Sequence, residues 1–184
     1  MSVLQITRGS TYCDSLQWST DECVFRPIKV VSSTAPVRLD CPSHGVPDDW
    51  EVSVEGHASI DPRKSFNVRL IDDDTLEIPC LNGTMFSASP AVLRYLMPVD
   101  LTGYEARLQI RDRVGGNLLL ELSSNAGAGI TIDHQLKQIK REIAADITAA
   151  LTWKRAVYDM EMILGSYVIK LDSGMVEVSD EVTT

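Results

Sequence analysis

The last third of the chain alternates between apolar and polar residues with a period of two, the pattern of a half-buried β-strand. Within Tyr104–Arg111, the residues Ala106, Leu108 and Ile110 share one face, while polar residues occupy the other. The same pattern predicts strands at Leu118–Leu122, Gly129–Asp133, Gln138–Ile143, Ala156–Met162, Tyr167–Leu171 and Met175–Val178, with turns at Arg113–Asn117 and Asp172–Gly174 and a short helical turn at Ala144–Leu151. Short strands at regular spacing predict an antiparallel sandwich.

The middle of the chain, from Pro27 to about Tyr95, has shorter strands separated by prolines and polar turns. The predicted strands are Ile28–Ser32, Val37–Asp40, Glu51–Glu55, Ser65–Ile71 and Thr75–Ile78. This spacing favours a small, SH3-like β-barrel over a sheet covered by helices. The fold class is therefore predicted to be all-β.

Two further strands, Val3–Thr7 and Tyr12–Ser19, are predicted to pair around Gly9. Two strands alone cannot bury an apolar face, so we expect them to complete the C-terminal sheet. Residues 1–24 plus 97–184 would then form a discontinuous sandwich, with residues 25–96 as an inserted barrel and its linkers. Asp14 shares the parity of the apolar residues in its strand, so it should lie at a bulge or pair with an arginine, because an unpaired buried carboxylate is costly.

Charge and cysteine content exclude several classes of protein. The 26 acidic residues against 17 basic ones give a net charge of −9, which argues against nucleic acid as a partner. No apolar run approaches the roughly 20 residues that cross a bilayer, and the first residues lack a secretory signal pattern, so no membrane partner is expected. The four widely spaced cysteines are predicted to be free and mostly buried thiols.

Two segments resemble known modules. The C-terminal segment resembles the immunoglobulin-like N-terminal domains of bacteriophage tail and baseplate proteins, including the upper baseplate protein family. The residues that carry this resemblance are Pro98–Arg111, a Gly-Gly turn, Gly129–Asp133 and Tyr158–Glu161. The middle segment resembles the small barrel known as the first catalytic-cysteine half-domain of ubiquitin-activating enzymes, a module that recurs in phage tail proteins. The residues that carry this resemblance are Lys29–Ser32, Ala35–Val37, His44-Gly45, Val52–Gly56 and Ile71–Ile78. The shared residues are turns and core, so the resemblance implies a barrel and no ubiquitin chemistry.

The residues with chemical potential favour structural roles. Asp100, Leu101, Thr102 and Gly103 are predicted to form a turn, with Leu101 filling the core beneath it. Asp72–Asp74 lacks the spacing of a calcium loop, and Cys41, His44 and Cys80 lack the second ligand pair of a zinc site. His57 and His134 have no catalytic partner motif. We therefore expect no enzyme activity, no cofactor and no metal.

The resemblance implies a non-enzymatic structural component of a bacteriophage virion, assembled in the host cytoplasm, that joins tail, baseplate or neck proteins or anchors a tail fibre. Its expected partners are other phage structural proteins, within a symmetric homo-oligomer or ring. The predicted interface residues are Val3, Gln5 and Thr7 on an edge strand, Trp50 at a loop tip, and Glu181 and Val182 in the C-terminal tail. The alternatives are a capsid decoration or host-binding module and, from another class, a metal-assisted hydrolase built on Cys41, His44 and the acidic turn.

Overall fold

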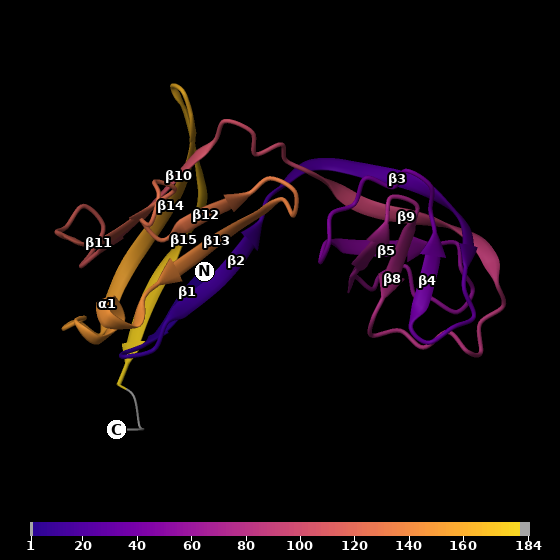
Figure 1. Cartoon of the computed structure of the whole chain (residues 1–184), viewed down its shortest axis with the longest axis horizontal. Helices are drawn as coiled ribbons and strands as arrows, with labels where there is room; N and C mark the ends of the chain where they lie inside the picture. The colour runs from indigo at the N-terminus through magenta and orange to yellow at the C-terminus, as the bar shows by residue number, and fades with distance from the viewer. Residues whose placement is uncertain (1, 181–184) are drawn as a thin grey trace. The chain divides into compact units, whose positions relative to one another are not determined.

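The computed structural model describes residues 2–180, and these residues form two compact β units (Figure 1). One unit consists of the residues up to Leu16 together with those from Asp100 onward, and the other is Gln17–Val99. Fifteen strands and a single helix of five residues make up the regular structure of residues 2–180. The prediction of an all-β fold is confirmed.

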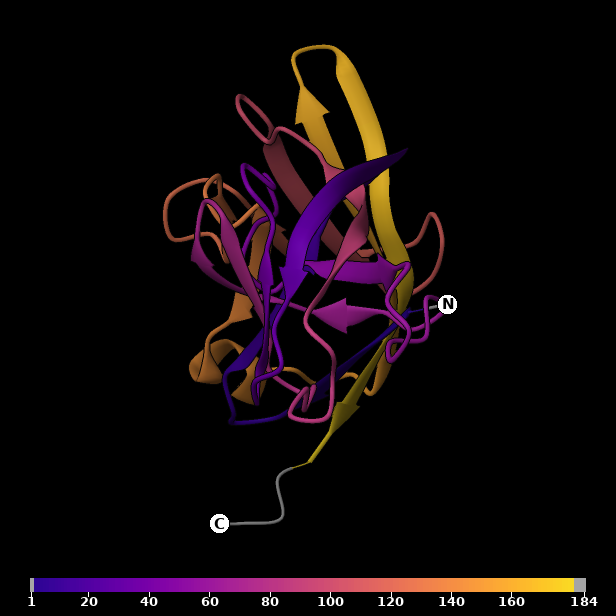
Figure 2. The ribbon, with the colours of Figure 1, turned by 90° about the vertical axis from the view of Figure 1, so that its right-hand side faces the viewer.

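The first unit, here called the sandwich unit, has two sheets. The five-stranded sheet has the order β1 (Ser2–Thr7), β15 (Tyr167–Ser179), β14 (Arg155–Leu164), β10 (Glu105–Arg111) and β11 (Leu118–Ser123). The three-stranded sheet has the order β12 (Ile130–Asp133), β13 (Gln138–Ile143) and β2 (Tyr12–Gln17). The helix α1 (Ala145–Ala149) follows β13, and the β14–β15 hairpin extends beyond its neighbouring strands (Figure 2).

The core of the sandwich unit is built from the apolar faces predicted by the alternation. In the β10–β14 register, Leu108 lies opposite Met160 and Ile110 lies opposite Tyr158. Leu108 and Met160 are fully buried, as are Ile139 of β13 and Val176 of β15. Burying such side chains stabilises the fold by about 1.5–3 kcal/mol each.

Two details of the predicted sandwich are wrong. Val3–Thr7 does not pair with the strand around Tyr12, because β1 pairs in parallel with β15 and β2 belongs to the other sheet. The turn expected at Asp172–Gly174 is absent, and β15 runs through it without a break. Gly174 is needed there because a Cβ atom would lie 1.9 Å from the carbonyl oxygen of Ser2 in β1. The glycine therefore permits the close approach of two strands.

The second unit, here called the barrel unit, is a single seven-stranded sheet. Its order is β6 (Phe66–Asn67), β5 (Glu51–Glu55), β9 (Ser89–Pro98), β3 (Ser19–Val31), β4 (Val37–Asp40), β8 (Thr75–Ile78) and β7 (Arg69–Asp72). The segment from β6 to β7 nearly closes the sheet, because β6 pairs with β5 and β7 pairs with β8. Val68 lies between them, and its N–H donates to the Trp50 carbonyl at 3.1 Å.

The barrel strands differ from the sequence prediction mainly in β3 and β9. The predicted bounds of Val37–Asp40, Glu51–Glu55 and Thr75–Ile78 match β4, β5 and β8. The strand β9 was not predicted, since Pro90 and Pro98 interrupt its pattern. It pairs with β3 from Ser19 opposite Pro98, so the predicted domain limits at residues 24 and 97 fall inside these two strands.

Candidate functional site

The strand β1 is one free edge of the five-stranded sheet, and it carries three predicted interface residues. Val3 is 44% exposed and Gln5 is exposed, whereas Thr7 is half-buried. The Gln5 amide donates to the Glu177 carboxylate at 3.4 Å on the outer face. An edge strand presents unpaired backbone groups to a partner, so the geometry suits the predicted contact. The predicted tail residues Glu181 and Val182 lie outside the described residues.

The strand β11, predicted at Leu118–Leu122, lies at the opposite edge of this sheet, a position that the sequence did not predict. It contains Leu118, Leu119 and Leu120, and Leu118 is 48% exposed. A shallow hollow of about 520 Å³ separates this edge from α1, whose Ile147 is 40% exposed. Three consecutive leucines in a strand were the signal that could have revealed an apolar edge.

Trp50 is not an exposed anchor, and this prediction is wrong. Its side chain is only 3% exposed and belongs to the barrel core. The indole Nε1 donates to the Leu96 carbonyl at 3.0 Å, which satisfies its polar atom inside the protein. The residue precedes β5 directly, and its pairing with Val68 draws the ring into the core.

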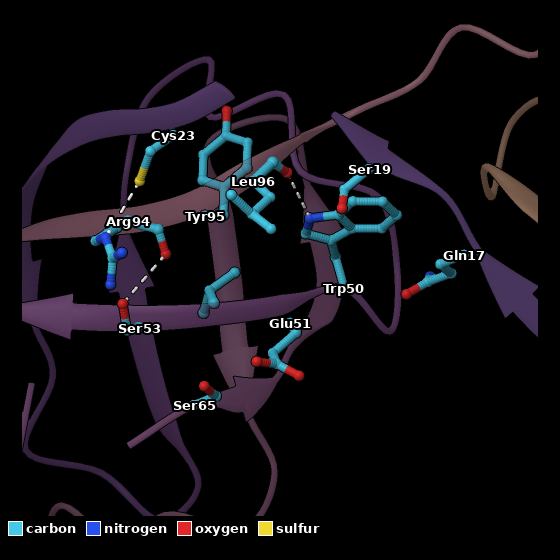
Figure 3. Close-up of a pocket in the computed structure, with 11 residues that line it drawn as sticks. Gln17, Ser19, Cys23, Trp50, Glu51, Ser53, Ser65, Arg94, Tyr95 and Leu96 are labelled. Atoms are coloured by element: carbon cyan, nitrogen blue, oxygen red, sulfur yellow. Dashed lines mark hydrogen bonds between the residues drawn. The ribbon is translucent and has the colours of Figure 1, made fainter. Parts of the chain in front are cut away.

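A hollow of about 410 Å³ lies on the barrel beside Trp50, between β3, β5 and β9 (Figure 3). Arg94 is its cation, and the Arg94 Nε donates to the Cys23 Sγ at 3.2 Å and lies 3.8 Å from the Glu55 carboxylate. The Ser53 hydroxyl donates to the Arg94 carbonyl at 3.5 Å. Glu51 adds a second carboxylate to the lining. The hollow thus offers hydrogen-bonding groups of both charges around an aromatic core residue.

A buried polar cluster joins the two sheets of the sandwich unit, and Arg141 of β13 is its centre. The Arg141 side chain is 2% exposed, and its guanidinium donates to both carboxylate oxygens of Asp14, one of these bonds being 2.8 Å long. It also donates to Asp172 of β15 at 2.9 Å. Asp172 accepts a further bond from the Tyr158 hydroxyl at 2.7 Å, and Asp14 accepts one from the Tyr12 hydroxyl at 2.7 Å. Asp14 was expected to lie at a bulge or to pair with an arginine, and it pairs with Arg141.

The electrostatics of this cluster favour the charged guanidinium and the neutral phenols. Burial raises the pKa of Tyr12 well above its usual value, and the hydrogen bond to Asp14 raises it further. For Arg141, burial acts to lower the pKa, but the hydrogen bonds and charge of Asp14 outweigh burial and raise it. The cluster therefore holds β2, β13 and β15 together through the charged Arg141 guanidinium, and its two phenols stay protonated near neutral pH.

Asp100, Leu101, Thr102 and Gly103 form a turn whose polar atoms bond locally. The Asp100 Oδ1 accepts from the Thr102 N–H at 3.2 Å and from its hydroxyl at 2.8 Å. The Thr102 bonds lower the pKa of Asp100, and Lys137 lowers it further. Leu101 is fully buried, and Gly103 has a φ of 77°, which favours glycine. The turn uses these side chains for its own geometry.

The predicted metal and catalytic candidates are engaged in structural contacts. The His44 Nδ1 accepts from the Val46 N–H at 3.0 Å, and the Nε2 lies 3.0 Å from the Asp72 carbonyl. His57 is buried beside Phe86. Within residues 2–180, no three His, Cys, Asp or Glu side chains are grouped to hold a metal ion. The hydrolase alternative therefore has no assembled site in this part of the chain.

The cysteines are free, but the prediction that most of them are buried is wrong. Cys41 is buried, Cys23 is half-buried, and Cys13 and Cys80 are exposed. Burial raises the pKa of the Cys41 thiol to about 11. Cys41 and Cys80 are not brought into one ligand group.

Comparison with known proteins adds no relative. No protein family matches the chain, and no curated protein is significantly similar to it. Among residues 2–180, no helix has the length and apolar character to span a membrane.

Proposed function

We propose that this protein is a non-enzymatic structural component of a bacteriophage virion, which joins tail, baseplate or neck proteins or anchors a tail fibre. The observation that carries the proposal is the free, uncharged β1 edge of the sandwich unit. The residues around Asp100–Gly103 and in the strands that follow carry the resemblance to phage tail modules, and the all-β fold agrees with it.

The sandwich unit is suited to hold this edge in a fixed position. The Arg141 cluster ties β15, the neighbour of β1, to the three-stranded sheet. Gly174 lets β1 approach β15 closely over six paired residues. A rigid edge forms contacts with a partner at a low cost in conformational entropy.

The outer face of the same sheet carries charges that pair with one another. Arg107 contacts Glu161 at 2.7 Å, and Lys170 contacts Asp159 at 2.9 Å. A face of this kind stays hydrated, which leaves the strand edges as the places where the sheet can be extended.

Antibody labelling of particles tests the proposal. Antibodies raised against the purified chain are applied to particles produced from the genome that carries its gene, and electron microscopy locates the label. Label confined to the tail, its tip or the neck is the expected result, and antibody absorbed with purified protein is the control. Label spread over the capsid lattice would indicate a decoration protein, and unlabelled particles would refute a virion role.

A further inference from the structure

The strand β1 ends the five-stranded sheet without the features that protect an exposed edge. Within residues 2–180 it pairs with β15 alone, over the six residues Ser2–Thr7. Its sequence, SVLQIT, contains no charged residue and no proline. Natural sheets guard exposed edges with charged residues, proline or very short strands. The outer edge of β1 is therefore able to pair with another strand.

Alternate residues of β1 direct their backbone groups to this outer edge. Neighbouring residues of a strand direct their N–H and C=O groups to opposite sides. Directly after β1, the Arg8 N–H donates to the Ser179 carbonyl of β15 at 3.0 Å, so the even-numbered residues face β15. The N–H and C=O groups of Val3 and Gln5 consequently point to the outer edge, where a partner strand can bond to them.

The turn after β1 limits where a partner strand can lie. The Thr7 carbonyl already accepts the Ser10 N–H at 3.2 Å, so the open stretch of the edge is Val3–Gln5. Two such stretches can pair antiparallel about a two-fold axis that passes through Leu4. Val3 of each copy then lies opposite Gln5 of the other, and each facing pair exchanges two backbone hydrogen bonds.

Side chains match on both faces of the sheet at this register. On the inner face the two Leu4 side chains meet at the axis, and Leu4 is only 3% exposed within its own sheet. The apolar layers of the two copies would then join without a shift of face. On the outer face Val3, which is 44% exposed, would be covered by the stem of Gln5 from the second copy. The Gln5 amide can keep its bond to Glu177 at 3.4 Å.

Other registers use this edge less well. A register that keeps the inner faces together can shift only by an even number of residues. One such shift places Val3 opposite Thr7, whose carbonyl the turn already uses. The opposite shift pairs Val3 with itself and moves Gln5 beyond Ser2 of the second copy. The register centred on Leu4 is therefore favoured.

We propose that β1 pairs antiparallel with β1 of a second copy, so that two five-stranded sheets join into one continuous sheet. Both copies use the same surface, so the contact is isologous and association stops at the dimer. Because β1 is uncharged, no like charges meet along the joint. The inference rests on the proposed function, since it names the partner of the edge on which that role depends.

Sedimentation of the full chain at rising concentration, under reducing conditions, tests this pairing. The wild type should reach a dimer and no larger species. Val3→Lys/Gln5→Lys should weaken association by about tenfold, because like charges would face each other twice across the joint. Val3→Glu/Gln5→Lys should associate at least as well as the wild type, because each lysine would face a glutamate.

The two double variants form a matched pair. Both carry a lysine beside Glu177, and they differ only in the sign of the charge at position 3. Circular dichroism shows that each variant is folded. Equal weakening of association in both variants would overturn the proposed pairing, because it would show that positions 3 and 5 do not face each other.

Disulfide cross-linking identifies the facing residues directly. In a chain that keeps only the buried Cys41, Val3→Cys mixed with Gln5→Cys should give a linked dimer on oxidation. A facing hydrogen-bonded pair has Cα atoms about 5.5 Å apart, a separation that a disulfide spans. Either variant alone should link far less, because its cysteines would lie about 7–8 Å apart on the diagonal. The control is Val3→Cys mixed with Gln135→Cys, at an exposed residue between β12 and β13, which should not link.

Two results would overturn the pairing: a wild type that stays monomeric up to its solubility limit, or a variant that links to itself as efficiently as to the other. The antibody labelling of particles is independent of both. Labelled tails with a monomeric chain would refute the pairing and leave the virion role standing. A dimer with unlabelled particles would refute the virion role and leave the pairing standing.

Discussion

Replacing Arg141 with methionine tests whether the buried polar cluster stabilises the sandwich unit. The change removes the cation that donates to Asp14 and Asp172 while keeping a long apolar side chain. Both carboxylates would remain in the interior without a positive partner. Removing one partner of a buried ion pair costs about 3–5 kcal/mol.

The exposure of the carboxylates places the expected loss at the lower end of that range. The Asp14 side chain is 31% exposed and that of Asp172 is 17% exposed, so water can partly hydrate both. We therefore expect Arg141→Met to lower the free energy of unfolding by about 3 kcal/mol. The control is Arg107→Met, which removes an arginine from an exposed ion pair with Glu161 and should cost less than about 1 kcal/mol.

Hydrogen–deuterium exchange read by mass spectrometry is the suitable assay, because two units can unfold separately and a single transition would mix them. Peptides from β13 and β15 should lose protection in Arg141→Met, whereas peptides from β4 and β8 should keep it. A loss below about 1 kcal/mol, or one equal to that of Arg107→Met, would refute the view that the cluster joins the two sheets.

Three further predictions concern single sites. Gly174→Ala should displace β1 and cost about 2 kcal/mol or more, because the new methyl group meets the Ser2 carbonyl; normal exchange protection of β1 would contradict this. Trp50→Ala should lower the free energy of unfolding of the barrel, measured in urea, by about 3–5 kcal/mol. Phe25→Ala, at a side chain that is 54% exposed, should lower it far less. Equal losses in the two variants would argue against Trp50 as a core residue. Because burial raises the pKa of Cys41 in the folded state, the thiol of the unfolded chain ionises first as the pH rises. The free energy of unfolding of the barrel should therefore fall by up to about 2 kcal/mol between about pH 8.5 and the folded pKa of about 11. The Cys41→Ala variant should lose less stability over that range.

The strands of the sandwich could be predicted from the sequence because their signal is local. In β10, Ala106, Leu108 and Ile110 alternate with polar residues, and the structure buries all three. The alternation depends only on which face of the strand packs against the core, so it can be seen without knowing the partner strand. The alternation also gave the all-β class, and the alanine-rich composition of Ala144–Leu151 gave the short helical turn.

The partners of those strands were decided by the tertiary structure. Nothing near Val3–Thr7 shows that β15 is its neighbour, and Gly174 is typical of a turn until Ser2 is seen against it. Trp50 follows two aspartates in a loop, yet its pairing with Val68 takes the ring into the core.

The sequence by itself determined where most strands of the sandwich unit run, which of their faces are apolar, and that an acidic residue at position 14 required a partner. Only the tertiary structure supplied that partner, Arg141, and showed that β1 and β11 are the two outermost strands of one sheet. The physical reason is that burial leaves a periodic record along the chain, whereas pairing between residues more than a hundred positions apart leaves no local pattern. Such pairing depends on the fit of whole surfaces, which exist only after the chain has folded.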